Sequence, residues 1–206
     1  SLGGLRGLKG FHAVPDISRY LKVQVVNRDS IEKRKIDPNQ CERLVRELRG
    51  CYDLNEQPFC AGFFVFSPAS LEQAVSLGLR QMLDRYAVVS EYGDQLAFNL
   101  YFYRRWQRLP LPYNIQVVGE RNAWHLPPED VAGIIFHFIS ADKPWIVKNY
   151  YYHEWLKNFN RADQIDLKRI PQGRPWSRRM IVECDRLLEN MRRRNRFYLW
   201  LDGYAG

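Results

Sequence analysis

Two apolar runs of strand length most constrain what this chain can fold into: 59–68 reads FCAGFFVFSP and 131–139 reads VAGIIFHFI. Their length, apolar content and flanking turn signals predict β-strands buried on both faces. A third, shorter strand is expected at 11–16, FHAVPD, where Pro and Asp predict a turn. Periodic apolar residues predict helices at 39–48, 70–86, 94–106 and 150–159. Strands that alternate with helices indicate an α/β layered fold, although these strands are too few for a complete parallel sheet.

The positive charge of the chain is concentrated near one end. The 206 residues carry a net charge of +8, and residues 168–196 alone hold ten Lys or Arg against three acids. Apolar residues on one helical stripe, Met180, Cys184, Leu187 and Met191, make 178–196 amphipathic. We therefore expect a basic extension at 161–206 that contacts an anionic membrane or RNA, or that is a solvated helix face.

The cysteines and the apolar content bear on the compartment. Cys41, Cys51, Cys60 and Cys184 show neither CxxC nor Cys/His metal spacing, so we expect free thiols. Free thiols favour a reducing compartment such as the cytoplasm. No apolar stretch of the sequence is long enough to cross a bilayer.

A histidine and a lysine follow the second apolar run. His137 lies near the end of the expected strand, and Lys143 stands six residues later in DKPW. A neutral imidazole is a ligand for a divalent metal, and a lysine on a loop stiffened by proline can contact a phosphate. The two residues fit a metal-diphosphate site at the end of a sheet. Taken without their wider context, the residues favour a different interpretation, in which His137 is a core histidine and Lys143 a solvated lysine.

Two further positions are candidates for contacts with a sugar. Asp94 accepts hydrogen bonds and Gln95 both donates and accepts, so the pair can hold sugar hydroxyls at the start of a helix. The alternative is that Asp94 only caps that helix. Gly62, within an apolar strand, allows a ligand to approach the backbone, or marks a bulge.

Four stretches, in this order, resemble glycosyltransferase family 8, the retaining GT-A enzymes that include glycogenin and galactinol synthase. FHAVPD is similar to the strand and turn that follow the family's Asp-x-Asp motif. The other three stretches are FCAGFFVFSPASLE at 59–72, YGDQLAFNLYFYRRWQRLPLPYN at 92–114 and HFISADKPW at 137–145. The resemblance covers about residues 11–145 and implies that residues 1–160 form the C-terminal part of a GT-A domain.

The resemblance also implies roles for single residues. His137 would bind manganese together with the Asp-x-Asp, and Lys143 would contact the donor diphosphate. Asp94 and Gln95 would face the transferred sugar or the acceptor. Glu91 stands where some glycogenin-like members carry a further carboxylate.

Three departures from the family pattern bear on the donor site. Cys60 replaces an asparagine that could bind donor hydroxyls, and Ser140 replaces a glycine beside the phosphates. Gly62 keeps the family's residue. The nucleotide-binding half with its Asp-x-Asp is absent, so we expect the chain to be a fragment that is inactive by itself.

The function implied is that of a metal-dependent, retaining hexosyltransferase. It would move a hexose from a nucleotide sugar, UDP-hexose above all, to a carbohydrate, polyol or protein acceptor. A non-catalytic relative, or a basic membrane- or RNA-binding module, are the alternatives.

Overall fold

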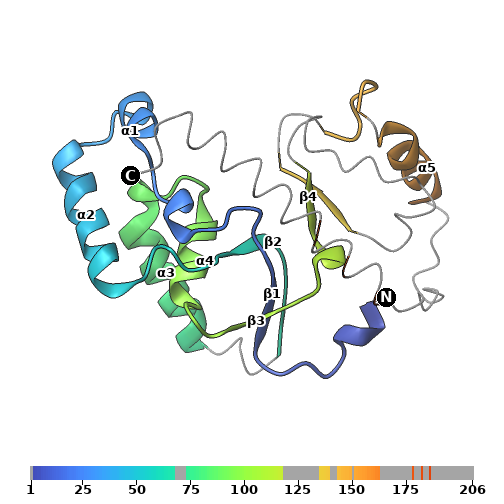
Figure 1. Ribbon diagram of the computed structural model, residues 1–206, viewed down its shortest axis with the longest axis horizontal. Coiled ribbons are helices and arrows are strands. Elements are labelled where there is room, and N and C mark those ends of the chain that lie inside the picture. The colour runs from blue at the N-terminus through green and yellow to red at the C-terminus, as the bar shows by residue number, and fades with distance from the viewer. Residues whose placement is uncertain are drawn as a thin grey trace. The chain divides into compact units, whose positions relative to one another are not determined.

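The computed structural model (Figure 1) describes residues 2–67, 73–117, 135–139, 143–149 and 151–162, together with residues 178, 182 and 186. The chain forms two compact units of mixed α/β structure. One is Gly7–Leu109, and the other joins Ser1–Arg6 to Pro110–Gly206. In the described part of the chain, no helix is long and apolar enough to span a membrane.

The sheet of the unit Gly7–Leu109 has the strand order β2-β1-β3. β1 (Phe11–Pro15) is buried along its whole length, as expected for a central strand. It runs antiparallel to β2 (Phe59–Phe66) and parallel to the short β3 (Trp106–Arg108). The predicted strand at 11–16 is therefore confirmed.

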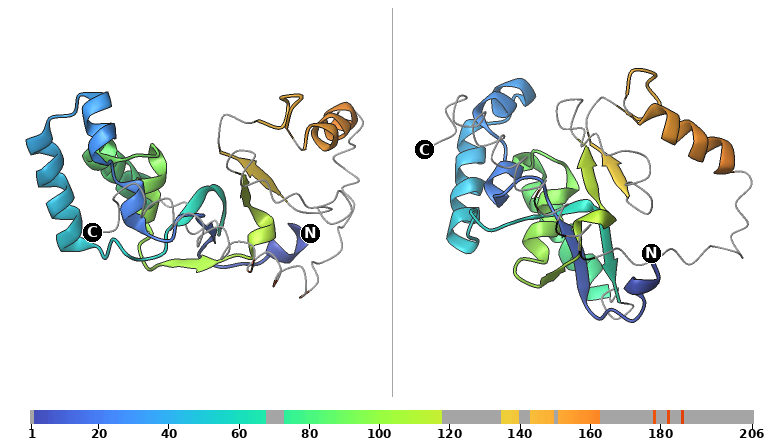
Figure 2. Two further views of the ribbon diagram at one scale, coloured as in Figure 1. Left: turned by 45° about the horizontal axis from the view of Figure 1, so that its top comes forward. Right: turned by 45° about the vertical axis from the view of Figure 1, so that its right-hand side comes forward.

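The described residues of the same unit form four α-helices, which lie to one side of its strands, with α1 and α2 farther from them than α3 and α4 (Figures 1 and 2). Asn27 and Asp37 accept backbone N–H bonds at the starts of α1 and α2 and so fix where these helices begin. The predicted helix at 39–48 is confirmed within α2. The helices are α1 (Arg28–Arg34), α2 (Pro38–Cys51), α3 (Gln73–Tyr86) and α4 (Asp94–Tyr101), with short 3-10 turns at Leu21–Gln24 (η2) and Ala87–Val89 (η4).

The core of this unit has an aromatic cluster beside the sheet and an aliphatic cluster between the helices. In the aromatic cluster the rings of Phe11 and Phe102 are stacked, with centroids 3.8 Å apart. In the aliphatic cluster Leu48 and Leu96 are completely buried. Burial of such side chains is worth about 1.5–3 kcal/mol each, so these clusters fix where α4 lies on the sheet.

Close contacts join α3 to its neighbours. A Cβ atom at Gly78 would clash with the ring of Tyr101, so a larger residue there would have to displace that ring from its place between α3 and α4. Across α2 and α3, the Glu47 carboxylate accepts hydrogen bonds from Arg85, at 2.7 Å, and from Tyr86. The Arg85 bond, then the Tyr86 bond, lowers the pKa of Glu47. Burial, then the bond to Glu47, raises the pKa of Tyr86.

The second unit contains a small parallel sheet and a helix. β4 (Ile115–Val117) pairs with β5 (Phe136–Phe138), and Gln116 is the register partner of His137. The helix predicted at 150–159 is confirmed as α5 (Tyr152–Ala162). Two 3-10 turns, at Leu2–Leu5 (η1) and Leu111–Tyr113 (η5), complete its described elements.

Three expectations about the elements need correction. β2 is a strand as predicted, but only Phe59 and Cys60 are buried, because β2 lies at the sheet edge. The helix predicted at 94–106 ends at Tyr101, since Trp106 joins the sheet as β3. Of the run predicted at 131–139 the structure describes only residues 135–139, in which Phe136–Phe138 forms a strand that is half-buried rather than buried.

Other expectations fall on residues outside the described part. These are the cap at Ser70, the apolar stripe within 178–196 and most of the extension 161–206. The division of the chain at residue 160 therefore stays a prediction. Cys41, Cys51 and Cys60 are free thiols, as expected, whereas Cys184 is not among the described residues.

Candidate functional site

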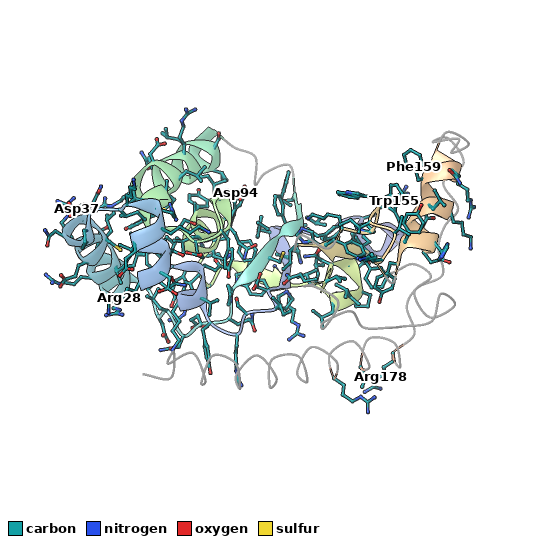
Figure 3. The ribbon with its side chains drawn as sticks, turned by 90° about the horizontal axis from the view of Figure 1, so that it is seen from above. Arg28, Asp37, Asp94, Trp155, Phe159 and Arg178 are labelled. Carbon is teal, nitrogen blue, oxygen red and sulfur yellow. The ribbon has the colours of Figure 1, made fainter. Side chains whose placement is uncertain are left out.

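The carboxylate of Asp94 lies at the start of α4, labelled in Figure 3. Asp94 is the first helical residue and is exposed, while Gly93, with a φ of 62°, occupies the N-cap position without a side-chain cap bond. The interpretation of Asp94 as the cap is therefore wrong. The positive end of the helix dipole favours a negative charge there. Asp94 thus presents an acceptor to solvent, suited to a sugar hydroxyl.

Gln95 joins α4 to two strands of the sheet. Its Nε2 donates to Oδ2 of Asp16 at 2.9 Å, and its Oε1 accepts from the backbone N–H of Ala61 at 3.1 Å. Both ends of the amide are engaged in this arrangement. Gln95 therefore positions Asp16 and β2, and the adjacent Asp94 is the member of the pair that faces outward.

Asp16 is a candidate site residue that sequence reasoning did not select. It follows β1, is 6% exposed, and its second carboxylate oxygen, Oδ1, accepts from the N–H of Ser18 at 2.7 Å. A buried charge is costly unless it is paired or hydrogen-bonded, which explains why both oxygens are held. The Pro-Asp turn at a strand end was the available signal, since ligands of α/β sheets gather at strand ends.

Asn99 is the second residue that was missed. Its Oδ1 accepts from the N–H of Phe59, and its Nδ2 donates to the carbonyl of Phe59, both at 2.8 Å. Nδ2 also donates to the carbonyl of Gln95 at 2.9 Å. Asn99 lies four residues after Gln95, so the two amides share one helix face and bond successive inward positions of β2. This spacing was the signal in the sequence.

Cys60 and Gly62 follow on the same strand. Cys60 is 2% exposed, and its Sγ accepts from the N–H of Gly62 at 3.3 Å. Gly62 itself is exposed, so its backbone is open to a ligand. The role of both residues in donor binding stays a prediction, for which Gly62 is the better placed.

Glu91 ties the loop before α4 to α1. Its Oε1 accepts from the hydroxyl of Ser30 at 2.8 Å, and its N–H donates to the carbonyl of Gln24 at 2.9 Å. Oε2 is buried and has no hydrogen-bond partner among the residues that the structure describes. The predicted contact of Glu91 with a substrate stays a prediction.

His137 lies in the middle of β5 rather than near its end. Neighbouring strand residues face opposite sides, and the rings of Phe136 and Phe138 both contact Tyr151, with centroids 4.6 and 5.9 Å away. His137 therefore faces the side opposite Tyr151. It is half-buried, and its predicted role as a metal ligand stays a prediction.

The side chain of Lys143 reaches the end of β5, the strand that carries His137. Its Nζ donates to the carbonyl of Phe138 at 2.5 Å, and the following Pro144 is buried. The ammonium thus lies one residue beyond His137, at the carboxyl end of β5. The structure brings these two predicted residues together, whereas Ser140 is not among the described residues.

A manganese ion bound by His137 would need further ligands from neighbouring side chains. Within the described ranges, no group of three or more His, Cys, Asp or Glu side chains could hold a metal ion. His137 is a single imidazole donor, and manganese prefers several oxygen ligands. The described residues therefore do not complete a manganese site.

Comparison with known proteins identifies the class. The chain belongs to glycosyl transferase family 8, whose pattern matches residues 11–148. The "Probable glycosyl transferase Gly" of Streptococcus gordonii is 28% identical to it over 123 residues. This alignment covers 59% of the chain and 18% of the curated relative, so the chain spans about a fifth of that protein. No solved structure matches the chain.

Proposed function

We propose that the chain is part of a glycosyltransferase that moves a hexose from a UDP-linked donor to an acceptor hydroxyl. Membership of family 8 supports glycosyl transfer and, with it, a GT-A fold. The observation that carries the proposal is the arrangement at α4, where Asp94 is exposed beside a Gln95 that holds Asp16. The acceptor would belong to a carbohydrate, a polyol or a protein.

Asp94, at the start of α4, would orient the reacting sugars. The exposed carboxylate of Asp94 would accept a hydrogen bond from a sugar hydroxyl. Because Gln95 fixes the start of α4 against β2, this bond would hold the sugar in one orientation for reaction. In the proposed front-face reaction, the acceptor oxygen bonds the anomeric carbon as the bond to the diphosphate oxygen breaks on the same face. The acceptor proton passes to the leaving diphosphate, and the anomeric configuration is retained.

His137 and Lys143 would act on the donor diphosphate. The ammonium of Lys143, held at the end of β5, would stabilise the charge that develops on the leaving group. Metal dependence is proposed from the family and from His137, with the oxygen ligands supplied outside the described residues. A bound manganese ion would neutralise diphosphate charge.

The test is UDP release by the full-length natural protein. The protein is incubated with manganese, a panel of UDP-hexoses and candidate acceptors, and the configuration of the product is read by NMR. We expect acceptor-stimulated UDP release with one donor and a product of retained configuration. Binding of UDP without turnover on any donor would favour the non-catalytic relative instead.

A further inference from the structure

Several large apolar side chains of the second unit are exposed beside one another. Trp145, Ile146, Val147 and Phe159 are 55, 42, 74 and 60% exposed. Trp155 connects them, since its ring centroid lies 6.3 Å from that of Trp145 and 5.2 Å from that of Phe159. Figure 3 shows Trp155 and Phe159 along α5. We call these five residues the aromatic patch.

The patch is not an ordinary scatter of exposed apolar residues. Single exposed apolar side chains are common on soluble proteins, but contiguous apolar patches mark surfaces of interaction. Trp155 and Phe159, one helical turn apart, lie on the same side of α5, and Trp145, Ile146 and Val147 are consecutive. The rings of Trp145, Trp155 and Phe159 therefore form one row of contacts, and the exposed Ile146 and Val147 follow Trp145 directly in the chain.

Charge indicates the kind of partner. Residues 145–162 contain three cationic side chains and one carboxylate, Glu154, whose Oε2 lies 3.9 Å from Nζ of Lys157. Tryptophan with basic residues is typical of protein segments that lie in the interface of an anionic bilayer. Ile146 and Val147 have no ring to stack on a base, so this surface suits a bilayer better than RNA. The cations are Lys148, Lys157 and Arg161.

We propose that the aromatic patch inserts into the headgroup region of an anionic lipid bilayer and attaches the protein peripherally to the membrane. Trp145 and Trp155 take the amphipathic interfacial positions, and Val147 and Phe159 reach the acyl boundary. The basic residues around the patch supply attraction to the anionic lipids. This attachment is independent of the proposed transfer reaction.

The first test is co-sedimentation of the full chain with vesicles of phosphatidylcholine alone or with about 30% phosphatidylglycerol. We expect binding to the anionic vesicles that weakens with added salt. The double substitution Val147→Ser with Phe159→Ser should lower the partition coefficient by about tenfold or more, because it removes apolar surface from the bilayer. The matched control is Leu77→Ser, at a 58% exposed leucine of α3, which should leave binding unchanged.

A second test uses the parent protein alone, so it does not depend on how the variant folds. Lipids brominated near the headgroup should quench the tryptophan fluorescence of the vesicle-bound chain. Absence of vesicle binding, absence of quenching, or equal losses in the Leu77 and patch variants would overturn the proposal. So would binding to single-stranded RNA, or self-association through the patch, in place of vesicle binding.

Discussion

Replacement of Asn99 by leucine tests how α4 is held on the sheet. Leucine has the same branched arrangement of side-chain heavy atoms as asparagine and is somewhat larger, so the buried site acquires no cavity, but the three hydrogen bonds of the amide are lost. Phe59 is completely buried, and its N–H then has no acceptor. The carbonyl of Phe59 also loses its donor, and Pro15, the register partner of Phe59 in β1, has no N–H that could replace it.

The expected cost follows from the two backbone groups of Phe59. A buried donor or acceptor left without a partner costs about 1–3 kcal/mol, so Asn99→Leu should destabilise this unit by roughly 2–4 kcal/mol. In urea denaturation this loss corresponds to a midpoint lowered by on the order of 1–2 M. Native-state hydrogen exchange should show the Phe59 amide losing protection.

The control is another helical asparagine with a similar local bond. Asn158 donates from Nδ2 to the carbonyl of Glu154 at 2.9 Å, but it is exposed. Asn158→Ala should change stability by about 0.5 kcal/mol or less. If Asn99→Leu costs no more than Asn158→Ala, the side-chain amide of Asn99 does not hold β2 against α4 and our reasoning is refuted.

Two further predictions concern α2 and α3. The pKa of Glu47 is lower in the folded protein than its ordinary value of 4.5. Its carboxylate therefore stabilises the fold above pH 4.5, and this stabilisation is lost as the pH falls through the lower pKa of the folded state. Glu47→Gln should remove this part of the pH dependence of the melting temperature. Gly78→Ala should destabilise by about 1–3 kcal/mol through the clash with Tyr101, whereas Gly50→Ala, with no atom within 4 Å of the added Cβ, should stabilise α2 by about 0.5–1 kcal/mol. Equal melting temperatures for the two glycine variants would contradict the close approach of α3 and α4.

Short stretches of sequence predicted those strands and helices whose ends or buried faces are defined by residues close together in the chain. The Pro-Asp turn marked the end of β1, and the apolar periodicity marked α2. Lys143 was expected beside His137 because a Pro-Trp pair stiffens the loop, and the structure places its ammonium at the end of the same strand.

The misses come from contacts between residues distant in sequence. Gln95 and Asp16 are 79 positions apart, and no local pattern shows that their side chains meet. The helix α4 was predicted too long because its aromatic periodicity continues through Phe102. In the fold Phe102 stacks on Phe11, and Trp106 then pairs with Phe11 in the sheet. Tertiary packing outweighed helix propensity there.

The most direct test of the central claim compares turnover by the parent and the Asp94→Asn variant of the full-length protein at saturating donor and acceptor. Asp94 makes no cap bond, but its charge interacts favourably with the helix dipole, so the substitution should cost at most about 1 kcal/mol of stability and leave the affinity for UDP unchanged. We predict that kcat falls by about tenfold or more, because the amide no longer offers two acceptor oxygens to the sugar hydroxyls. An unchanged kcat in a folded, UDP-binding variant would contradict the assignment of this site to sugar transfer.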